Sequence, residues 1–316
     1  MRIMYQYRNI RHVTAMLLWA ALAARVDAGP LRVMATTSLI GDVARAVAGP
    51  DVEVTALIPP QVDPHAFDPT PREMARLEQA DLVLANGLGL ETFLDKILAA
   101  GGARAQGRLV VLSEGRNPRR GCAHGHEEED HAPHAHGEDD PHVWFDPTWV
   151  RHWAETIANA LAARDPGNAS SYRARAEAYG ETLAALDDEL RAKLDAIPRE
   201  RRILVTDHDE FGYLADRYGL TIVGALLPNV STLAESSARS LANLQRRMRE
   251  TGAHVIVVGH SANPTLADRL ARDTGARVIR LHTHSVGPAG SPTATYLEFM
   301  RHNVLLLTEA LKADAP

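Results

Sequence analysis

Short apolar runs alternate with helical stretches through most of the chain, and this alternation limits the possible folds more than any other feature. In the first half, the runs occupy residues 31–35, 52–58, 81–85 and 109–112. In the second half, they occupy residues 203–206, 221–224, 255–258 and 277–281. Runs that are apolar on both faces are typical of parallel strands covered by helices on both sides. The sequence therefore predicts an α/β protein with two doubly wound lobes.

A long amphipathic stretch separates the two halves of the 316-residue chain. Residues 169–196 carry apolar side chains at spacings of three and four, after a breaker segment at 165–168 and before Pro198. Such a helix is roughly 40 Å long at 1.5 Å per residue. We expect this rigid helix to join the lobes, which predicts an N-terminal lobe at 29–164, a connecting helix at 165–198 and a C-terminal lobe at 199–316. A helix packed within one domain is the alternative.

The first 28 residues have the features of a signal peptide. Arg2, Arg8 and Arg11 precede an apolar run at 13–24, which is too short to span a bilayer of roughly 30 Å as a helix. The small residues before the expected cleavage point favour cleavage after Ala28. The prediction is an exported chain, and an uncleaved membrane anchor is the alternative.

Charge and cysteine content limit the possible cellular compartments and the possible classes of binding partner. The formal net charge of −6 argues against a nucleic-acid-binding protein, because phosphate neutralisation needs a surplus of Lys and Arg. Cleavage removes four Arg and one Asp, so the mature chain carries −9. The single cysteine, Cys122, cannot form an internal disulfide and lies far from the place of a lipid-anchoring cysteine. We expect a soluble protein of a Gram-negative periplasm that carries no lipid anchor.

The segment 121–141 has almost no apolar side chain larger than alanine, so it cannot form a core. Seven carboxylates accompany its five clustered histidines, which are His124, His126, His131, His134 and His136. A mobile chain of this composition can bind divalent metal in many equivalent ways, which predicts an auxiliary site of modest affinity. A solvated acidic loop with incidental histidines is the alternative.

Three other histidines occur in stretches that are expected to be ordered. Residues 63–71 read D-P-H-A-F-D-P-T-P, residues 140–147 read D-P-H-V-W-F-D-P, and residues 206–211 read T-D-H-D-E-F. The prolines stiffen the first of these loops before a helix that begins near Arg72. All three stretches follow expected strand ends, where open α/β sheets bind ligands.

These stretches resemble the zinc- and manganese-specific periplasmic solute-binding proteins of ABC importers. The resemblance covers essentially the whole mature chain, including residues 206–220 and 296–303. It implies two α/β lobes joined by one long helix, with the metal in the cleft between them. It also implies that the loaded protein docks on an inner-membrane permease driven by a cytoplasmic ATPase.

By this resemblance, His65 and His142 are metal ligands from the first lobe and His208 is a ligand from the second. The fourth position departs from the family pattern: similar proteins place an aspartate in a loop of the form T-D-S-L-G, and residues 283–287 here read T-H-S-V-G. His284 takes that place. The other candidates for the fourth ligand are His260, His282 and a water molecule.

The expected ligand set favours zinc as the transported ion. Imidazoles suit tetrahedral zinc, whereas manganese prefers carboxylate and water, although copper and nickel also bind imidazole well. Four carboxylates are expected to orient the imidazoles, and these are Asp68, Asp146, Asp207 and Asp209. Because ligand imidazoles must be neutral, affinity is expected to weaken below about pH 6.5.

Other functions are compatible with a histidine-bound metal. In an exported zinc hydrolase, three histidines hold the metal and Asp209 or Glu210 is the general base, but no H-E-x-x-H pair occurs and a filled fourth position leaves no water to activate. A manganese receptor, a passive metal buffer and an adhesin are further alternatives. We expect a monomeric zinc receptor that is not an enzyme, and loading by a periplasmic metallochaperone stays open.

Overall fold

The computed structural model describes residues 29–94, 107–121, 139–227, 232, 237–260 and 262–313. The chain divides into two units, Met1–Leu31 and Arg32–Pro316, and both sheets lie in the second unit apart from the first residue of the first strand. The predicted signal peptide and the five clustered histidines lie outside the described residues. In the part of the chain that is described, no helix has both the length and the apolar composition that a membrane crossing requires.

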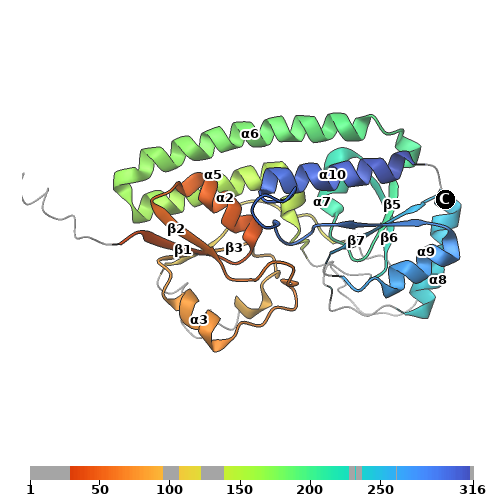
Figure 1. The fold of residues 1–316 in the computed structure, drawn as a ribbon, viewed down its shortest axis with the longest axis horizontal. Coiled ribbons are helices and arrows are strands. Elements are labelled where there is room, and N and C mark those ends of the chain that lie inside the picture. Colours follow the sequence, from red (N-terminus) through yellow and green to blue (C-terminus); the bar gives the residue numbers. More distant parts are fainter. Residues whose placement is uncertain are drawn as a thin grey trace, which may run out of the picture. The chain divides into compact units, whose positions relative to one another are not determined.

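The first lobe contains a four-stranded sheet in the order β2-β1-β3-β4 (Figure 1). Its strands are β1 (Leu31–Ala35), β2 (Val52–Ala56), β3 (Leu82–Ala85) and β4 (Leu109–Val111). β1 and β3 pair in parallel, as do β3 and β4. β2 ends two residues before the predicted strand, although Leu57 and Ile58 still donate backbone hydrogen bonds to the carbonyl oxygens of Ala35 and Thr36.

The second lobe repeats this arrangement with the order β6-β5-β7-β8. Its strands are β5 (Ile203–Thr206), β6 (Thr221–Ala225), β7 (Val255–Gly259) and β8 (Arg277–Leu281). All three neighbouring pairs are parallel. In both lobes the second strand lies on one side of the first and the third strand lies on the other, so each sheet has a switch point of the kind where open α/β sheets bind ligands. The predicted fold class is confirmed.

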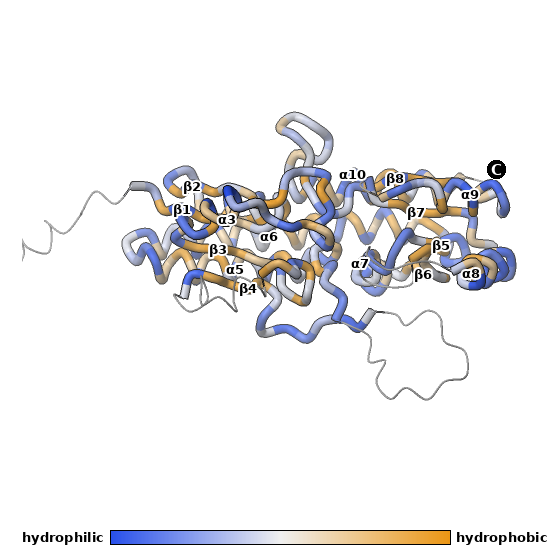
Figure 2. Tube along the Cα trace, turned by 90° about the horizontal axis from the view of Figure 1, so that it is seen from below, coloured by the Kyte–Doolittle hydropathy of each residue, from blue (hydrophilic) through white to orange (hydrophobic). Residues whose placement is uncertain are grey.

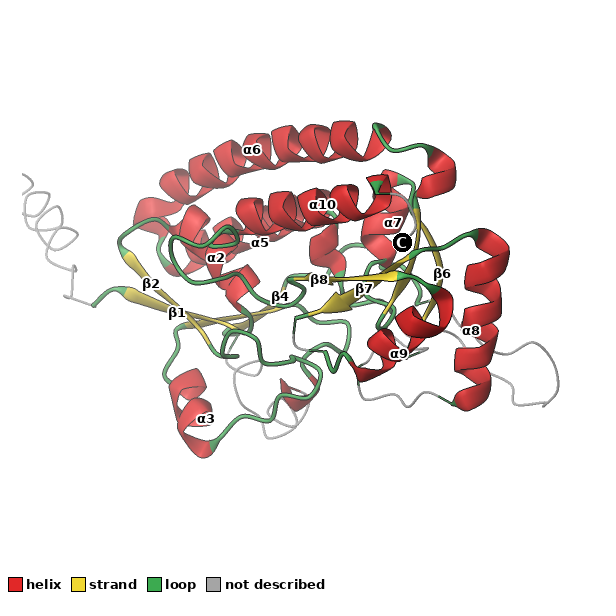
Figure 3. Cartoon of the chain, turned by 45° about the vertical axis from the view of Figure 1, so that its right-hand side comes forward, coloured by secondary structure: helices red, strands yellow, loops and turns green. Residues whose placement is uncertain are grey.

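Helices cover both faces of each sheet (Figure 3). They are α2 (Ser38–Ala48), α3 (Pro71–Glu78), α5 (Pro147–Arg164), α6 (Ala169–Asp195), α7 (Gly212–Tyr218), α8 (Ala238–Thr251), α9 (Thr265–Thr274) and α10 (Tyr296–Lys312), with 3-10 turns η1 (Val143–Phe145), η2 (Pro166–Asn168) and η3 (Arg199–Arg201). The central strands β3, β5 and β7 are strongly hydrophobic in Figure 2, and all residues of β3 and β7 are buried. This burial explains why these strands do not alternate between apolar and polar residues.

The long helix α6 packs against elements of both lobes. Near its start, Arg175 donates hydrogen bonds to the carbonyl oxygens of Val47 and Ala48 at the end of α2, at 2.7 and 2.6 Å. Near its end, Glu189 accepts a hydrogen bond of 2.8 Å from Arg301 of α10. The helix therefore holds the first lobe through one half of its length and the second lobe through the other. The exact domain boundaries stay a prediction.

Candidate metal centre

Four histidines converge in the interior of the protein. One ring nitrogen from each of His65, His142, His208 and His284 lies within 4.8 Å of the corresponding nitrogen of the other three. Their exposed fractions range from 0% at His142 to 8% at His284, so the cluster is shielded from bulk water. The structure thus brings together the four histidines that the sequence analysis named as the expected metal ligands. That they bind the metal in this chain stays a proposal.

The parallel sheets deliver these histidines to one place. His65 follows β2, His208 follows β5 and His284 follows β8, all beyond the carboxyl ends of strands. His142 comes directly before η1 and α5 in the first lobe. The loops of His65 and His142 each lead into a helix that has a side-chain cap, Thr70 for α3 and Asp146 for α5. Such a cap contributes on the order of 1 kcal/mol and fixes where the loop ends.

Three aspartates fix the backbone of three of the histidines. The carboxylate of Asp63 accepts the His65 N–H at 2.9 Å, that of Asp140 accepts the His142 N–H at 3.0 Å, and that of Asp207 accepts the His208 N–H at 2.8 Å. In the D-P-H stretches the proline between the two residues has a fixed φ, which restricts the loop further. The side chains are therefore held in place before any ion binds.

Two of these aspartates also contact the imidazole ring that follows them. Oδ1 of Asp140 lies 2.8 Å from Nδ1 of His142, and Oδ1 of Asp207 lies 3.1 Å from Nδ1 of His208. Donation of the Nδ1 proton to a carboxylate leaves the lone pair on Nε2, which is the nitrogen that faces the other histidines. Oδ2 of Asp207 is itself held by the Gly259 N–H at 2.9 Å.

Burial sets the protonation state of the cluster. Burial is the largest cause that lowers the pKa of His65 to about 4 and that of His284 to about 3, and the charge of His208 lowers both further. Burial also lowers the pKa of His142 well below its usual value. These three imidazoles are therefore neutral at pH 7 and keep their lone pairs available. The pH below which they protonate is lower than the 6.5 expected from the sequence.

Burial also changes the pKa of Asp140, whose carboxyl group contacts the ring of His142. It raises the pKa of Asp140 to about 8, while the hydrogen bond from the His142 N–H and the charge of Arg119 lower it. A dication bound at the histidines adds a further positive charge nearby, which favours the carboxylate form of Asp140.

The spacing of the His65 and His142 nitrogens is close to that of a tetrahedral zinc site, and all four ring nitrogens lie within 4.8 Å of one another. With Zn–N bonds of about 2.0 to 2.1 Å, neighbouring ligand nitrogens are about 3.3 Å apart. Nε2 of His65 and Nε2 of His142 are 3.1 Å apart. Nε2 of His208 and Nε2 of His284 are buried and have no hydrogen-bond partner among the described residues. Buried nitrogens without partners are costly unless a ligand engages them, which fits a cation site at this position.

Glu210 is a further acidic group at the cluster. Its Oε2 lies 3.7 Å from Nε2 of His208 and 3.6 Å from Nε2 of His284. The residue is fully buried, and burial raises its pKa well above its usual value. The sequence indicated Glu210 only as the general base of a hydrolase. Its position two residues after His208, directly beyond a strand end, was the available signal for a place beside the metal.

Hydrogen bonds between the lobes border the cluster. Trp144 donates its indole N–H to the carbonyl oxygen of Thr283 at 2.8 Å, and its ring lies against the rings of His142 and His284, with centroids 5.3 and 6.0 Å away. Ser38 accepts a hydrogen bond from the Val286 N–H at 3.0 Å. The loop that carries His284 is therefore positioned by residues of the first lobe.

Three of the four carboxylates expected to orient the imidazoles have other roles. Asp68 is exposed. Asp146 caps α5 and lies 3.2 Å from Arg217, and Asp209 lies 3.8 Å from Arg119. Asp207 is the one of the four for which the structure gives a contact with a ring of the cluster, that of His208. The reason is geometric: in each loop the orienting aspartate stands one or two residues before its histidine and closes a short turn onto it.

The two alternative candidates for the fourth ligand lie outside the cluster. The rings of His260 and His282 are next to each other, with centroids 4.2 Å apart, and neither belongs to the group of converging nitrogens. His284 occupies the fourth position instead. Residues two apart in an extended segment face the same side, but the chain bends at His284, so the rings of His282 and His284 do not share a site.

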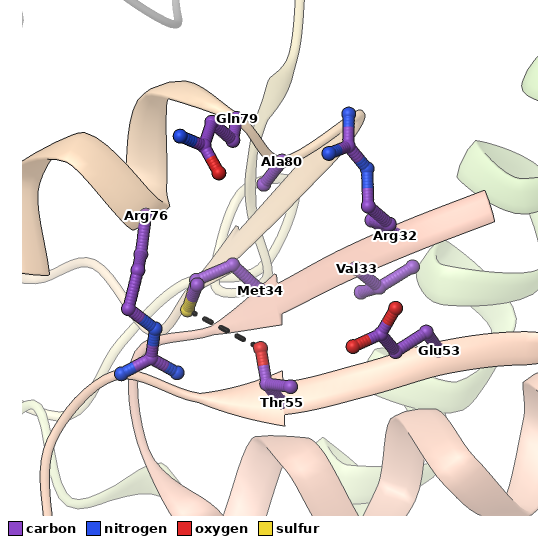
Figure 4. A pocket seen from close by; sticks show the side chains of 8 residues that line it. All are labelled: Arg32, Val33, Met34, Glu53, Thr55, Arg76, Gln79 and Ala80. Carbon is purple, nitrogen blue, oxygen red and sulfur yellow. Dashed lines mark hydrogen bonds between the residues drawn. The ribbon is translucent and has the colours of Figure 1, made fainter. Parts of the chain in front are cut away.

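A separate pocket of about 170 Å³ lies in the first lobe (Figure 4). It is lined by Arg32, Val33, Met34, Glu53, Thr55, Arg76, Gln79 and Ala80, with a contact of 3.6 Å between Oγ1 of Thr55 and Sδ of Met34. It contains none of the four histidines. We therefore take the histidine cluster as the candidate site.

Comparisons with known sequences show the family of the chain. Residues 33–310 match the family described as "Zinc-uptake complex component A periplasmic". The zinc-binding protein TroA of Treponema pallidum (strain Nichols) is 31% identical over 294 residues, which cover 91% of each chain. The manganese-binding lipoprotein MntA of Bacillus subtilis (strain 168) is 31% identical over 290 residues, which cover 89% of this chain and 90% of MntA.

Solved structures of similar proteins share the fold of this chain. The periplasmic zinc-binding protein TroA superposes with a TM-score of 0.78 at 30% identity, covering 90% of this chain and 100% of TroA. The Mn-bound periplasmic metal-binding protein of Candidatus Liberibacter asiaticus superposes with a TM-score of 0.75 at 25% identity, covering 89% of this chain and 99% of that one.

Two parallel-sheet α/β lobes around a cluster of buried histidines define a metal-binding solute receptor. The chain belongs to the family of the periplasmic component A of zinc-uptake complexes. It is the divalent-metal receptor of an ABC importer and works with an inner-membrane permease and its ATPase. Family members are substrate-binding proteins rather than enzymes, so the hydrolase alternative is not supported.

The lowered histidine pKa values predict how the stability of the metal-free protein depends on pH. An unfolded histidine has a pKa of about 6.5, so between pH 6.5 and 4 the unfolded chain binds more protons at His65 and His284 than the folded chain does. The contribution of these two histidines to the free energy of unfolding is therefore fully present above pH 6.5 and decreases as the pH falls toward 4. Urea titrations in chelator at several pH values measure this, and a double His65→Gln, His284→Gln variant is expected to show a flatter profile. Equal pH dependence in wild type, this variant and a His152→Gln control contradicts the prediction.

The position of Glu210 predicts a contribution to metal affinity. A bound dication favours the carboxylate form of Glu210, and that charge, close to two histidine nitrogens, attracts the ion in a buried, poorly screened site. We expect Glu210→Gln to weaken Zn²⁺ binding by at least about tenfold, or roughly 1.4 kcal/mol. Competition against a chromophoric chelator measures the change. Asp209→Asn, which alters the adjacent carboxylate that faces Arg119, is the control and is expected to have a smaller effect. A larger loss in the control contradicts this role for Glu210.

Proposed function

We propose that the protein is a periplasmic zinc receptor that captures Zn²⁺ with His65, His142, His208 and His284 and delivers it to the importer. One observation carries this proposal: four imidazoles, from loops of both sheets, converge within 4.8 Å in the interior. Four nitrogen ligands and a spacing near 3.3 Å are the arrangement that tetrahedral zinc requires.

The donor atoms favour zinc over manganese. Manganese prefers oxygen donors at six-coordinate sites, and imidazole suits zinc. The names of the relatives include both metals, zinc for TroA and manganese for MntA, so membership of the family does not decide between them. The choice for this chain rests on His284, which stands where the family resemblance described in the sequence analysis implies an aspartate. A neutral imidazole in that position removes an oxygen donor and a negative charge.

Zinc capture follows from the positions of the loops. His65 and His142 belong to the first lobe, and His208 and His284 belong to the second. An ion bound to all four links the lobes, in addition to the hydrogen bond that Trp144 donates to Thr283. Because a ligand that binds only the folded state stabilises it, zinc is expected to raise the melting temperature.

The remaining features of the receptor are proposals from the sequence. We propose export by the signal peptide at 1–28 and a monomeric protein; the expected absence of a lipid anchor is not proposed, because it conflicts with the names of the relatives. Several relatives, MntA among them, are named as lipoproteins. We also propose that the histidine-rich segment 121–141 captures zinc for the buried site. Transfer from a periplasmic metallochaperone is compatible with this role.

Metal titration of the purified mature protein tests the zinc assignment. We expect Zn²⁺ to bind far more tightly than Mn²⁺, and His208→Ala to weaken the tightest zinc site by at least about a hundredfold, or roughly 2.7 kcal/mol. His254→Ala, in the same lobe, is the control and is expected to bind like the wild type. His284→Asp restores an oxygen donor and is expected to narrow the preference for zinc over manganese.

Two results would overturn the assignment. Tighter binding of Mn²⁺ than of Zn²⁺ by the wild-type protein would make it a manganese receptor. Unchanged zinc affinity in a folded His208→Ala protein would remove the histidine cluster as the binding site. Circular dichroism of each variant establishes that it is folded.

A further inference from the structure

A second group of histidines lies in the C-terminal lobe, apart from the four-histidine site. His260 follows β7, His282 follows β8, and His302 lies in α10. The ring centroids of His260 and His282 are 4.2 Å apart, and those of His282 and His302 are 5.9 Å apart. None of the three belongs to the cluster of four converging histidines. The three residues are called the outer triad below.

Hydrogen bonds fix the backbone positions of His260 and His282. Gly259 and Leu281 are opposite each other in the parallel pair β7–β8, and the His260 N–H donates to the carbonyl oxygen of Leu281 at 3.0 Å. His260 and His282 are therefore lateral neighbours at the carboxyl edge of the sheet. The buried side chain of Asn303 accepts the His282 N–H at 3.0 Å and donates to the His282 carbonyl oxygen at 2.7 Å. This double hydrogen bond fixes His282 against α10, next to His302.

The ring spacing of His282 and His302 is compatible with a shared metal ion, whereas His260 must rotate to join them, because ring nitrogens of all three residues do not lie within 4.8 Å of one another. Within the four-histidine site the centroid separations run from 5.2 to 6.0 Å. The 5.9 Å separation of His282 and His302 lies in that range. His260 is closer to His282 than two ligands of one zinc ion are, but it is exposed at the strand end and can rotate outward. None of the three rings forms a hydrogen bond with another described residue, so no such bond competes with a metal for their nitrogens.

The surroundings of the outer triad differ from those of the buried site. His260 is exposed, and His282 and His302 are partly exposed, so a bound ion keeps some water ligands. The positive charge of Arg280 acts on His260, which opposes cation binding. Both features indicate a weaker site than the one formed by four buried imidazoles.

We propose that His260, His282 and His302 form a second, weaker site for a divalent transition-metal ion that prefers imidazole ligands, with Zn²⁺ as the natural occupant. His282 and His284 lie two residues apart on one segment, which Asn303 holds at the backbone of His282 and the indole of Trp144 holds at the carbonyl oxygen of Thr283. With the segment held at both points, binding at one site is expected to proceed independently of the other. The proposal does not depend on whether the buried site prefers zinc or manganese.

Equilibrium dialysis of the full mature chain against excess Zn²⁺ tests the proposal. We expect His302→Gln and His260→Gln each to lower the bound zinc by one equivalent at saturation and to leave the affinity of the tightest site unchanged. His254→Gln, in the same lobe, is the control and is expected to bind as much zinc as the wild type. The histidine-rich segment is the same in all four proteins, so its contribution cancels in the comparison. Saturation values equal to the wild type in both triad variants overturn the proposal.

A second measurement locates the ion directly. Crystals grown with excess zinc and measured at the zinc absorption edge are expected to show an anomalous peak bonded to ring nitrogens of His282 and His302, in addition to the peak at the buried site. A peak at the buried site with none at the outer triad overturns the proposal, whatever the buried site prefers.

Discussion

The structure depends on one constraint: four imidazole rings must share a volume small enough for a single cation while shielded from water. Neutral imidazoles tolerate this because burial removes their protons, as the lowered pKa values of His65, His142 and His284 show. Two of the nitrogens, Nε2 of His208 and Nε2 of His284, are left without hydrogen bonds among the described residues. In the folded protein a cation is the partner that can engage all four nitrogens at once.

The α/β architecture brings the four rings together with short loops. Parallel strands end at the same edge of a sheet, so loops from separate strands approach one another without long connections. In the loops of His65, His142 and His208, an aspartate closes onto the backbone N–H of the histidine and fixes its direction. The helix α6 then bonds to both lobes, through Arg175 on one side and Glu189 on the other. The histidine cluster is thus held by the loops locally and by α6 through its bonds to both lobes.

Much of the fold and of the histidine cluster could be predicted from the sequence. The features that were not predicted were missed for physical reasons. The strands were predictable because buried parallel strands are continuous apolar runs, and β1, β5 and β8 have the predicted bounds. The four histidines were recognisable from motifs next to prolines and strand ends. The orienting role of Asp140 was missed because sequence alone does not show which of two carboxylates flanking His142 turns back onto it. The depressed pKa of His284 depends on burial by residues far away in the chain, such as Trp144, which no local pattern records.

X-ray absorption spectroscopy of the mature protein loaded with one equivalent of zinc tests the central claim most directly. Convergence of four imidazoles on one ion predicts about four nitrogen scatterers at about 2.0 to 2.1 Å, with the outer-atom scattering that is characteristic of imidazole rings. A six-coordinate shell dominated by oxygen, or a shell with fewer than three imidazoles, would contradict it.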